Sequence, residues 1–413
     1  MIKYKLEDIS LVVGGGTPPT TNERNYDGDI VWITPKDLSD QNEKFIERGQ
    51  RSITLEGFNA CSAQMIPPYN ILMSSRAPIG LLAINRYECC TNQGFKSLIL
   101  NKDICDVDYV YYYLKHHIRE IESLGSGTTF KEVSKKALQS FEFSLPELEV
   151  QLKISKLLSD IDAKISLNRW INHNLEAMTK QLYDYWFVQF DFPDENGMPY
   201  KSSGGKMVWN EKLKREIPEG WNLIFAKDIC PIITGKEDAN FSTAYGQYPF
   251  FTCAKENLNC NTYAFDGSSI LIAGNGDFNV KHYTGKFNAY QRTYVLIPNI
   301  EHYACLFFAA SSKIRLFKEN SNGSIVKFIT KGNVEDIELL ESKNSHLCNT
   351  LNSLLFSIEQ NNQGIVELTK LRDSLLPLLI NGQVEIGVEH SRLNYDLSND
   401  WFLSSRKFLL YMM

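Results

Sequence analysis

The sequence predicts an α/β protein with a twofold internal repeat, in which two similar globular domains are each followed by a long helix. Three observations indicate this fold class: matched segments at a nearly constant offset, two heptad patterns, and a polar connector between the two copies. The 413 residues, 43% of them hydrophobic and 22% charged, suffice for several domains with buried cores.

The repeat consists of four features in the same order. An apolar run that ends in a polar or basic turn occupies 69–84 and again 268–283. A glutamine-containing segment follows at 92–100 and 290–298, then an aromatic helical segment, then 126–143 and 322–339. Ile71 and Ile270 are 199 positions apart, and Gly127 and Gly323 are 196 apart. We interpret this constancy as a duplicated domain.

A heptad pattern follows each copy. The first helix is expected from about residue 148 to 187, which at 1.5 Å per residue is about 60 Å long. Its apolar stripe has a second row at the +3 offset, formed by Leu157, Ile171, Met178 and Tyr185, and the second helix has Leu351, Ile358 and Ile365 alongside its stripe. The seven-residue repeats are Ile154, Ile161, Asn168, Leu175 and Leu182 in the first helix, and Leu347, Leu354, Asn361, Leu368 and Leu375 in the second.

Neither stripe is stable in water, and the simplest way to bury both is to pack one helix on the other. The pattern therefore predicts an intramolecular coiled coil that separates the two globular domains. Asn168 and Asn361 would then fix the register of the pair at some cost in stability. The alternative is that both are ordinary core helices.

The stretch between the copies is rich in Gly, Pro, Ser and charge, which is typical of a surface connector. The expected domains are 1–146, a helix at 147–192, a linker at 193–219, a second domain at 220–342, a second helix at 343–382, and a tail at 383–413.

Composition limits the classes of function. A net charge of −6 and a pI near 5.8 do not favour a broad basic face, unless Lys and Arg gather on one surface or a partner adds positive charge. The nine cysteines show neither C-x-x-C pairs nor zinc spacing, so we expect reduced, mostly buried thiols and no metal site. The N-terminus lacks the features of a signal peptide, and we expect a soluble cytoplasmic protein.

Motifs for catalysis are incomplete. "GGGTPPTT" at 14–21 lacks the Lys and the helix start of a phosphate-binding loop. "IPPYN" at 66–70 has Ile where an adenine methyltransferase needs Asn, Asp or Ser, and "AGNG" at 273–276 is a lone G-x-G. We therefore expect no catalytic residues in this chain.

The turns of the two copies carry residues suited to DNA recognition. Arg, Asn and Gln form bidentate contacts with base edges, and Lys neutralises phosphate. For any one residue the alternative is a solvated surface charge, but the repeat places such residues at similar positions twice. Two similar domains on a spacer suggest a two-part target with half-sites about 34 Å apart. The candidates are Thr17, Lys36, Arg76, Gln93, Lys96, Thr128, Lys131 and Lys135 in the first copy, and Lys236, Asn275, Lys281, His282, Arg292 and Lys327 in the second.

The central region carries a specific resemblance. Residues 144–221, beginning "SLPELEVQLKISKLLSDIDAKISLNRW", closely resemble the central region of the specificity subunits of Type I restriction-modification systems. "GGGTPPTTNERNYDGDIVWITPKDL" at 14–38 resembles the opening of the first target recognition domain of that family, and "IPEGW" at 217–221 the start of the second.

The resemblance implies two target recognition domains, each followed by a helix, with the helices packed antiparallel. It also implies a non-catalytic subunit that recognises a bipartite double-stranded DNA target. Two modification subunits, which hold S-adenosylmethionine, would dock on the helices, and ATP-dependent restriction subunits would join the complex; the chain itself would hold no cofactor. Positive surface on those partners would account for its acidity. The segment 388–413 extends beyond the family's usual end.

Two other classes of function stay open at this point. A stand-alone DNA methyltransferase with divergent motifs would bind S-adenosylmethionine by itself. A protein-only scaffold that uses the coiled coil would not change the mobility of DNA even with partners present.

Overall fold

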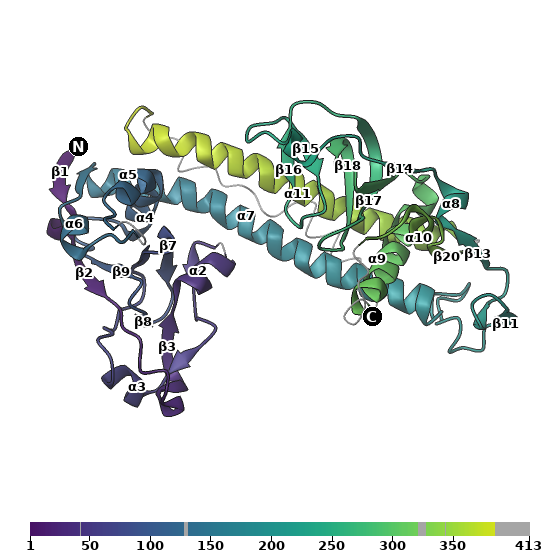
Figure 1. Cartoon of the computed structure of the whole chain (residues 1–413), viewed down its shortest axis with the longest axis horizontal. Coiled ribbons are helices and arrows are strands. Elements are labelled where there is room, and N and C mark those ends of the chain that lie inside the picture. The colour runs from purple at the N-terminus through teal and green to yellow at the C-terminus, as the bar shows by residue number, and fades with distance from the viewer. Residues whose placement is uncertain (42, 128–130, 321–327, 343, 385–413) are drawn as a thin grey trace. The chain divides into compact units, whose positions relative to one another are not determined.

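The computed structural model describes residues 1–41, 43–127, 131–320, 328–342 and 344–384, and divides into two compact units (Figure 1). Unit 1 comprises Met1–Ser166 and Glu367–Met413, and unit 2 comprises Leu167–Val366. Both boundaries fall inside the two long helices, α7 (Leu148–Tyr183) and α11 (Ser345–Ile380). Each unit therefore contains a globular part and a section of both helices.

Unit 1 is built on a five-stranded sheet of order β2-β9-β6-β7-β4, with a three-stranded sheet β5-β3-β8 and the pair β1-β10. Its strands are β1 (Ile2–Lys5), β2 (Ser10–Gly14), β3 (Tyr26–Ile33), β4 (Phe45–Ile46), β5 (Ser52–Ile53), β6 (Ile71–Ser75), β7 (Ile79–Asn85), β8 (Cys90–Thr91), β9 (Lys96–Leu100) and β10 (Glu142–Leu145). Its helices are α1 (Leu6–Ile9), η1 (Glu23–Asn25), α2 (Pro35–Gln41), α3 (Leu55–Asn59), α4 (Val107–His116), α5 (Ile118–Ser123) and α6 (Lys135–Gln139).

Unit 2 is built on a six-stranded sheet of order β14-β19-β17-β18-β15-β16, with the pairs β13-β20 and β11-β12. Its strands are β11 (Met207–Asn210), β12 (Arg215–Pro218), β13 (Asn222–Phe225), β14 (Ile232–Thr234), β15 (Tyr248–Phe251), β16 (Leu258–Cys260), β17 (Phe265–Ala273), β18 (Val280–Ala289), β19 (Thr293–Leu296) and β20 (Glu338–Glu341). Its helices are η2 (Asp184–Val188, a π turn that prolongs α7), α8 (Ala226–Ile229), η3 (Ala239–Phe241), η4 (Ile300–His302), α9 (Tyr303–Asn320) and α10 (Lys331–Glu335).

The order of several elements recurs between the two units. β1-α1-β2 of unit 1 corresponds to β13-α8-β14 of unit 2, the hairpin β6-β7 to β17-β18, and β10-α7 to β20-α11. Local hydrogen bonds recur as well. The carboxylate of Asp8 accepts from the backbone N–H of Lys5 at 2.7 Å, and that of Asp228 accepts from Phe225 at 3.0 Å. The units differ most between β2 and β6, where unit 1 has additional short elements.

Burial along α7 agrees in part with the predicted seven-residue row, of which Leu175 and Leu182 are only partly buried, and it contradicts the predicted +3 row. In α7, Ile154, Ile161 and Asn168 are buried, as the heptad pattern predicts. The +3 row is wrong, because Leu157, Met178 and Tyr185 are each 37% exposed. The buried row lies at +4, since that step brings side chains to the same face as the seam: Leu158, Ile165, Asn172, Thr179 and Trp186.

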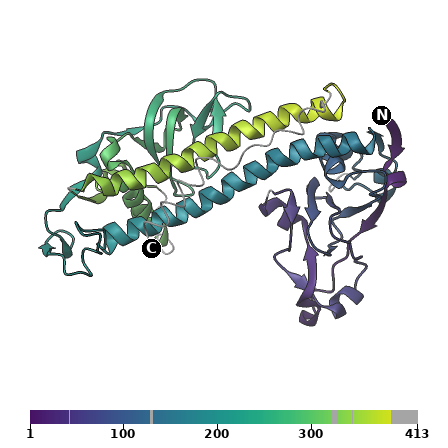
Figure 2. The ribbon, with the colours of Figure 1, turned by 180° about the vertical axis from the view of Figure 1, so that it is seen from behind.

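Within each unit the two long helices contact each other, and Figures 1 and 2 both show α7 and α11 side by side. In unit 1 the first turns of α7 share a hydrophobic core with the last turns of α11, through Ile154, Leu158 and Leu376. In unit 2 Leu175 and Leu182 of α7 pack against the core that holds Leu351 and Leu355 of α11. The start of one helix thus packs on the end of the other, so the helices are antiparallel. Leu354, Asn361, Leu368 and Leu375 of the predicted stripe are partly buried.

Asparagines interrupt the seam in unit 2. The side-chain amide of Asn172 donates to the amide oxygen of Asn362 at 2.8 Å and to the carbonyl of Ile358 at 3.2 Å. Asn361 donates to the amide oxygen of Asn172 at 2.9 Å. Asn172 is buried, Asn361 is partly buried and Asn362 is exposed, so the bonds join the two helices at the edge of their contact. Asn361 takes part in them, as the sequence predicts, whereas the partner on α7 is Asn172 rather than the predicted Asn168.

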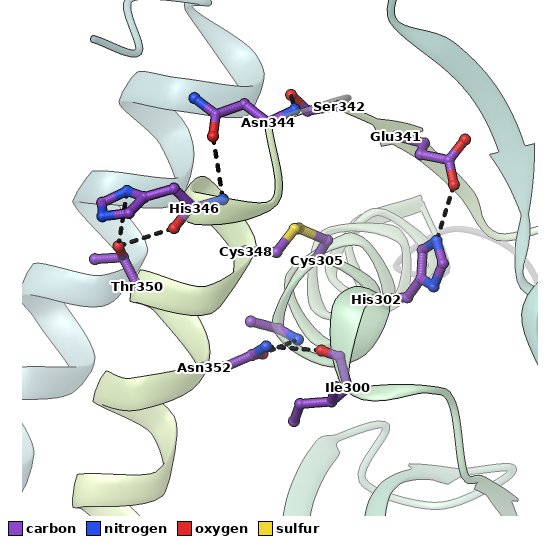
Figure 3. Close-up of a disulfide and its surroundings, with 11 residues drawn as sticks. Ile300, His302, Cys305, Glu341, Ser342, Asn344, His346, Cys348, Thr350 and Asn352 are labelled. Carbon is purple, nitrogen blue, oxygen red and sulfur yellow. Dashed lines mark hydrogen bonds and ion pairs between the residues drawn. A yellow bond between two sulfur atoms is a disulfide. The ribbon is translucent and has the colours of Figure 1, made fainter. Parts of the chain in front are cut away.

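The expectation of reduced cysteines needs one correction. Cys305 of α9 and Cys348 of α11 form a disulfide, with Cα atoms 6.3 Å apart (Figure 3). The spacing of 43 residues gave no sign of this pair, because it depends on α9 packing against α11. The other cysteines are free thiols, and burial raises the pKa of Cys89 to about 12.

The predicted connector at 193–219 is partly structured. It contains the hairpin of β11 and β12, in which Ile217 of β12 is buried, and Phe192 just before the connector is buried as well. The ring of Phe192 stacks on Tyr200 and on Trp221, with centroids 4.7 and 5.0 Å apart. The connector therefore caps the end of α7 with an aromatic cluster.

Candidate nucleic-acid interface

In unit 1, predicted DNA-contacting residues gather around the turn between β8 and β9. The carbonyl of Gly94 accepts from the backbone N–H of Ser75 at 2.7 Å, which places Arg76 beside Gln93. The hydroxyl of Thr17 donates to the amide oxygen of Gln93. Lys36 follows Pro35, whose ring lies 3.1 Å from where a Cβ on Gly94 would be. Four predicted residues thus come from four chain segments to one edge of the sheet.

Glu132 joins two further cations at this edge. Its carboxylate accepts from the Nζ of Lys96 at 3.0 Å, and its other oxygen lies 3.7 Å from the guanidinium of Arg76. An antiparallel backbone bridge between Arg76 and Glu132 joins these two segments of the chain. Lys131 and Lys135 are exposed next to it, and Thr128 lies outside the described residues. Glu132 was not among the predicted residues, and its position within 126–143, the segment that matches 322–339, was the available signal.

The glycine run at 14–16 has a steric role here. A Cβ on Gly15 would lie 2.0 Å from the carbonyl oxygen of Asn92, and one on Gly235 would lie 2.1 Å from that of Ala289. Both positions require glycine because two backbones approach closely beside the turn. The run is therefore packed against the turn that carries Gln93, and it forms no phosphate cradle.

Unit 2 builds the corresponding edge with the same backbone contacts. The carbonyl of Arg292 accepts from the N–H of Gly274 at 2.9 Å, as Gly94 accepts from Ser75 in unit 1. A bridge then joins Asn275 and Phe328, at the positions of Arg76 and Glu132. The backbone N–H of Gln291 donates to the carbonyl of Glu237 at 3.0 Å, next to exposed Lys236. Lys236, Asn275 and Arg292 are thus brought together.

Two predicted residues of unit 2 have other surroundings. The Nζ of Lys281 donates to the carbonyl of Ala254 at 2.7 Å and to Asn257 at 2.8 Å, and burial lowers its pKa. The ring of His282 lies 4.9 Å from that of Phe307 of α9, and burial lowers its pKa to about 4. His282 is therefore a neutral packing group, which does not favour a contact with DNA. Lys327 lies outside the described residues.

A second candidate surface lies on the long helices, away from the seam. Trp170 is 65% exposed and Leu167 is 45% exposed on α7, and Val366 is 52% exposed on α11. In unit 1 the exposed apolar side chains of these helices include Leu152 and Leu371. Exposed large hydrophobics on one element favour a protein partner over solvent.

No helix in the described ranges has the length and apolar character needed to cross a membrane. No three His, Cys, Asp or Glu side chains in the same ranges are grouped so that they could hold a metal ion.

Comparison with known proteins agrees with the duplicated architecture. The family model described as the Type I restriction modification DNA specificity domain matches residues 1–177 and 218–340. The MjaIX specificity subunit of a Type I restriction enzyme from Methanocaldococcus jannaschii is 29% identical over 92% of this chain and 93% of its own length. The EcoDI specificity subunit from Escherichia coli is 36% identical over 41% of this chain and 40% of its own.

A solved structure shows the same fold. The S subunit of a Type I restriction-modification system from M. genitalium superposes with a TM-score of 0.60 and 17% sequence identity, over 92% of this chain and 95% of that one.

Proposed function

Because the chain belongs to the Type I restriction-modification DNA specificity family, we propose that each of its two globular domains recognises one half of a bipartite DNA target. As a specificity subunit the chain is a non-catalytic recognition component. The observation that carries the proposal is the match of one family model to both halves of the chain, at 1–177 and at 218–340.

The geometry of the two sheet edges supports this assignment. Each edge presents a polar hairpin residue, Arg76 or Asn275, on a backbone frame that recurs in both units. Cationic side chains surround each hairpin, with Lys36 and Lys131 in unit 1 and Lys236 and Arg292 in unit 2. Side chains with bidentate donors select bases and the lysines neutralise phosphates, which is the division of contacts that specific DNA binding requires.

The helices then act as the spacer. We propose that α7 and α11 form one antiparallel coiled coil, that the two domains are related by a pseudo-twofold axis, and that the length of the coil sets the number of base pairs between the half-sites. Supporting this, the antiparallel contacts occur in both units, and side-chain bonds of Asn172 to Asn361 and Asn362 join the helices in unit 2.

Modification subunits are the proposed partners of the exposed helix surface. They would supply S-adenosylmethionine and the methyl transfer, and ATP-dependent restriction subunits would complete the assembly, so this chain would hold neither cofactor. The net charge of −6 is compatible with DNA binding in such a complex, because partner subunits would supply much of the phosphate neutralisation.

Mapping methylated adenines genome-wide tests the proposal. Cells that express the modification subunits with this chain should methylate a two-part motif, and cells that lack this chain should not. Methylation that is unchanged without the chain would contradict the proposal, as would binding of S-adenosylmethionine by the purified chain alone.

Docking on the helices is tested by Trp170→Ala. A large exposed aromatic at the centre of an interface typically contributes 2 kcal/mol or more, so the affinity for modification subunits should fall by about thirtyfold or more. Trp209→Ala is the matched control, since Trp209 is 56% exposed on β11, outside the helices. Equal affinities for wild type and Trp170→Ala would place the docking surface elsewhere.

A further inference from the structure

The hairpin between β6 and β7 holds a charged triad whose counterpart in unit 2 is uncharged. Arg76 and Lys96 both contact Glu132, at 3.7 and 3.0 Å. At the corresponding bridge in unit 2, Asn275 faces Phe328. The backbone frame is shared, so the difference between the two edges lies in the side chains.

We propose that Arg76, held by Glu132 and Lys96, recognises a guanine in the half-site bound by unit 1. This inference rests on the proposed function and adds to it the base that one residue selects. Guanine presents two acceptors, N7 and O6, in the major groove, and an arginine fork is the side chain that fits both.

The geometry of the triad favours a base over a phosphate. The guanidinium has five N–H donors in a plane, and its Nη1 lies 3.7 Å from a carboxylate oxygen of Glu132, beyond hydrogen-bond distance, so this ion pair leaves the donors available to a base. A carboxylate next to the guanidinium repels phosphate oxygens and, by attracting Nη1, biases the orientation of the fork. Lys96, with a side chain only 16% exposed, holds the carboxylate from the protein side. Arg76 itself has a side chain that is 38% exposed, enough to meet a ligand.

Glu132 is accordingly a positioning residue in this proposal. It contacts no base, but it limits the rotamers that Arg76 samples before DNA binds. Lys131 and Lys135, which carry exposed ammonium groups nearby, are left to contact phosphate without sequence preference.

The experiment compares methylation motifs from cells that express the modification subunits with variants of the full chain. The wild-type motif should contain a G·C pair in one half-site that becomes degenerate in Arg76→Ala, with discrimination reduced by about tenfold to a hundredfold. Glu132→Gln should relax the same base pair more weakly. Phe328→Gln, at the matched position of unit 2, should leave that pair unchanged.

Three results would overturn the inference: an unchanged motif in Arg76→Ala, an equal loss of methylation at all sites, which marks a phosphate contact, or relaxation of the same pair by Phe328→Gln. Arg76→Lys keeps the charge but lacks the fork, so it decides the question if Arg76→Ala does not fold. A wild-type complex that yields no bipartite motif would instead contradict the proposed function, which separates the two failures.

Discussion

In unit 1 the aromatic helix α4 is joined to the long helices by buried charges, whereas in unit 2 the corresponding helix α9 is joined to α11 by a disulfide. Lys44 forms a buried ion pair with Asp108 of α4, and its Nζ lies 3.3 Å from the hydroxyl of Tyr112. That hydroxyl donates to Asp162 of α7 at 2.6 Å, and Asp162 accepts from Arg372 of α11 at 2.7 Å. The network thus connects three helices.

Unit 2 has a covalent connection at the same joint. Cys305 and Cys348 link α9 to α11, and the side chain of Asn352 accepts from the N–H of Ala304 at 2.9 Å and donates to Ile300 at 2.7 Å (Figure 3). In both units the aromatic helix thus packs against a long helix. The interactions that join the two helices differ, with buried ion pairs and hydrogen bonds in unit 1 and a disulfide in unit 2.

The largest effect is expected for Lys44→Ala. Removing one partner of a buried ion pair leaves Asp108 without its countercharge, which typically costs about 3–5 kcal/mol of the free energy of unfolding. Urea unfolding should show the loss, and hydrogen exchange should place it in unit 1. Lys153→Ala, which removes an exposed pair with Glu149, is the control and should change little. Equal stability of Lys44→Ala and wild type would mean that the network does not hold the joint.

Reduction of the disulfide should have the next largest effect. A cross-link of this kind typically contributes about 2–4 kcal/mol, mainly by restricting the unfolded chain, and the loop between Cys305 and Cys348 spans 43 residues. Thermal melts with and without dithiothreitol should therefore separate, and Cys348→Ser should melt like the reduced protein under both conditions. If dithiothreitol shifts Cys348→Ser as much as wild type, the effect comes from another thiol.

A buried side-chain amide bonds the long helix to the start of the aromatic helix in both units, and substitutions test whether this shared contact stabilises each unit. Gln151 of α7 accepts from the N–H of Asp106 at 3.0 Å and donates to the carbonyl of Ile104 at 3.2 Å, and Asn352 makes equivalent bonds to Ala304 and Ile300 in unit 2. Gln151→Ala and Asn352→Ala should each lower the free energy of unfolding by about 1–3 kcal/mol, because buried backbone groups lose their partners. Hydrogen exchange should assign each loss to its own unit. A loss confined to one variant would show that only one joint needs the amide.

The smallest expected effect is the response of unit 2 to acid. Burial lowers the pKa of His282 from 6.5 to about 4, so its contribution is complete above pH 6.5 and about 3 kcal/mol is lost as the pH falls to 4. Burial raises the pKa of Glu359 from 4.5 to about 6, so its contribution is complete below pH 4.5 and about 2 kcal/mol is lost as the pH rises through 6. The contributions of His282 and Glu359 thus oppose each other, and together they should lower the stability of unit 2 by only about 1 kcal/mol when the pH falls from 7 to 4.

Variants separate the two opposing contributions. Glu359→Gln should lose stability steeply between pH 6.5 and 4, because only the effect of His282 remains. His282→Leu should gain stability over the same range, because only Glu359 remains. Urea unfolding at a series of pH values measures both slopes, and slopes of the same sign in the two variants would show that one of the assignments is wrong.

Much of the fold could be predicted from sequence, because the repeat and the heptads are periodic. The strands of both hairpins, the aromatic helices and the limits of α7 follow from patterns that burial imposes on consecutive residues. The second buried row of α7 was misplaced by one residue. Positions 157 and 158 both lie near Ile154 on the helix surface and both carry leucine, so the sequence does not show which of them is buried.

The candidate site was predictable in part. Thr17, Arg76 and Gln93 were correctly expected at turns, and the structure brings them together. Glu132 could not be found by a search for cations, because its role depends on a bridge between distant segments. His282 lies on strand β18, where successive side chains point to opposite faces of the sheet. The sequence does not show which face is buried, and only the contact with Phe307 of α9 shows that His282 points inward.

The composition of unit 1 has a consequence for biosynthesis. Its core includes Leu376, Leu379 and Ile380, which the ribosome adds after the whole of unit 2. The N-terminal domain therefore emerges first but keeps an apolar face of α7 uncovered until the end of α11 has been translated. Nascent chains of this architecture should depend on chaperones for that interval, and a premature stop within α11 should compromise the domain that was translated first.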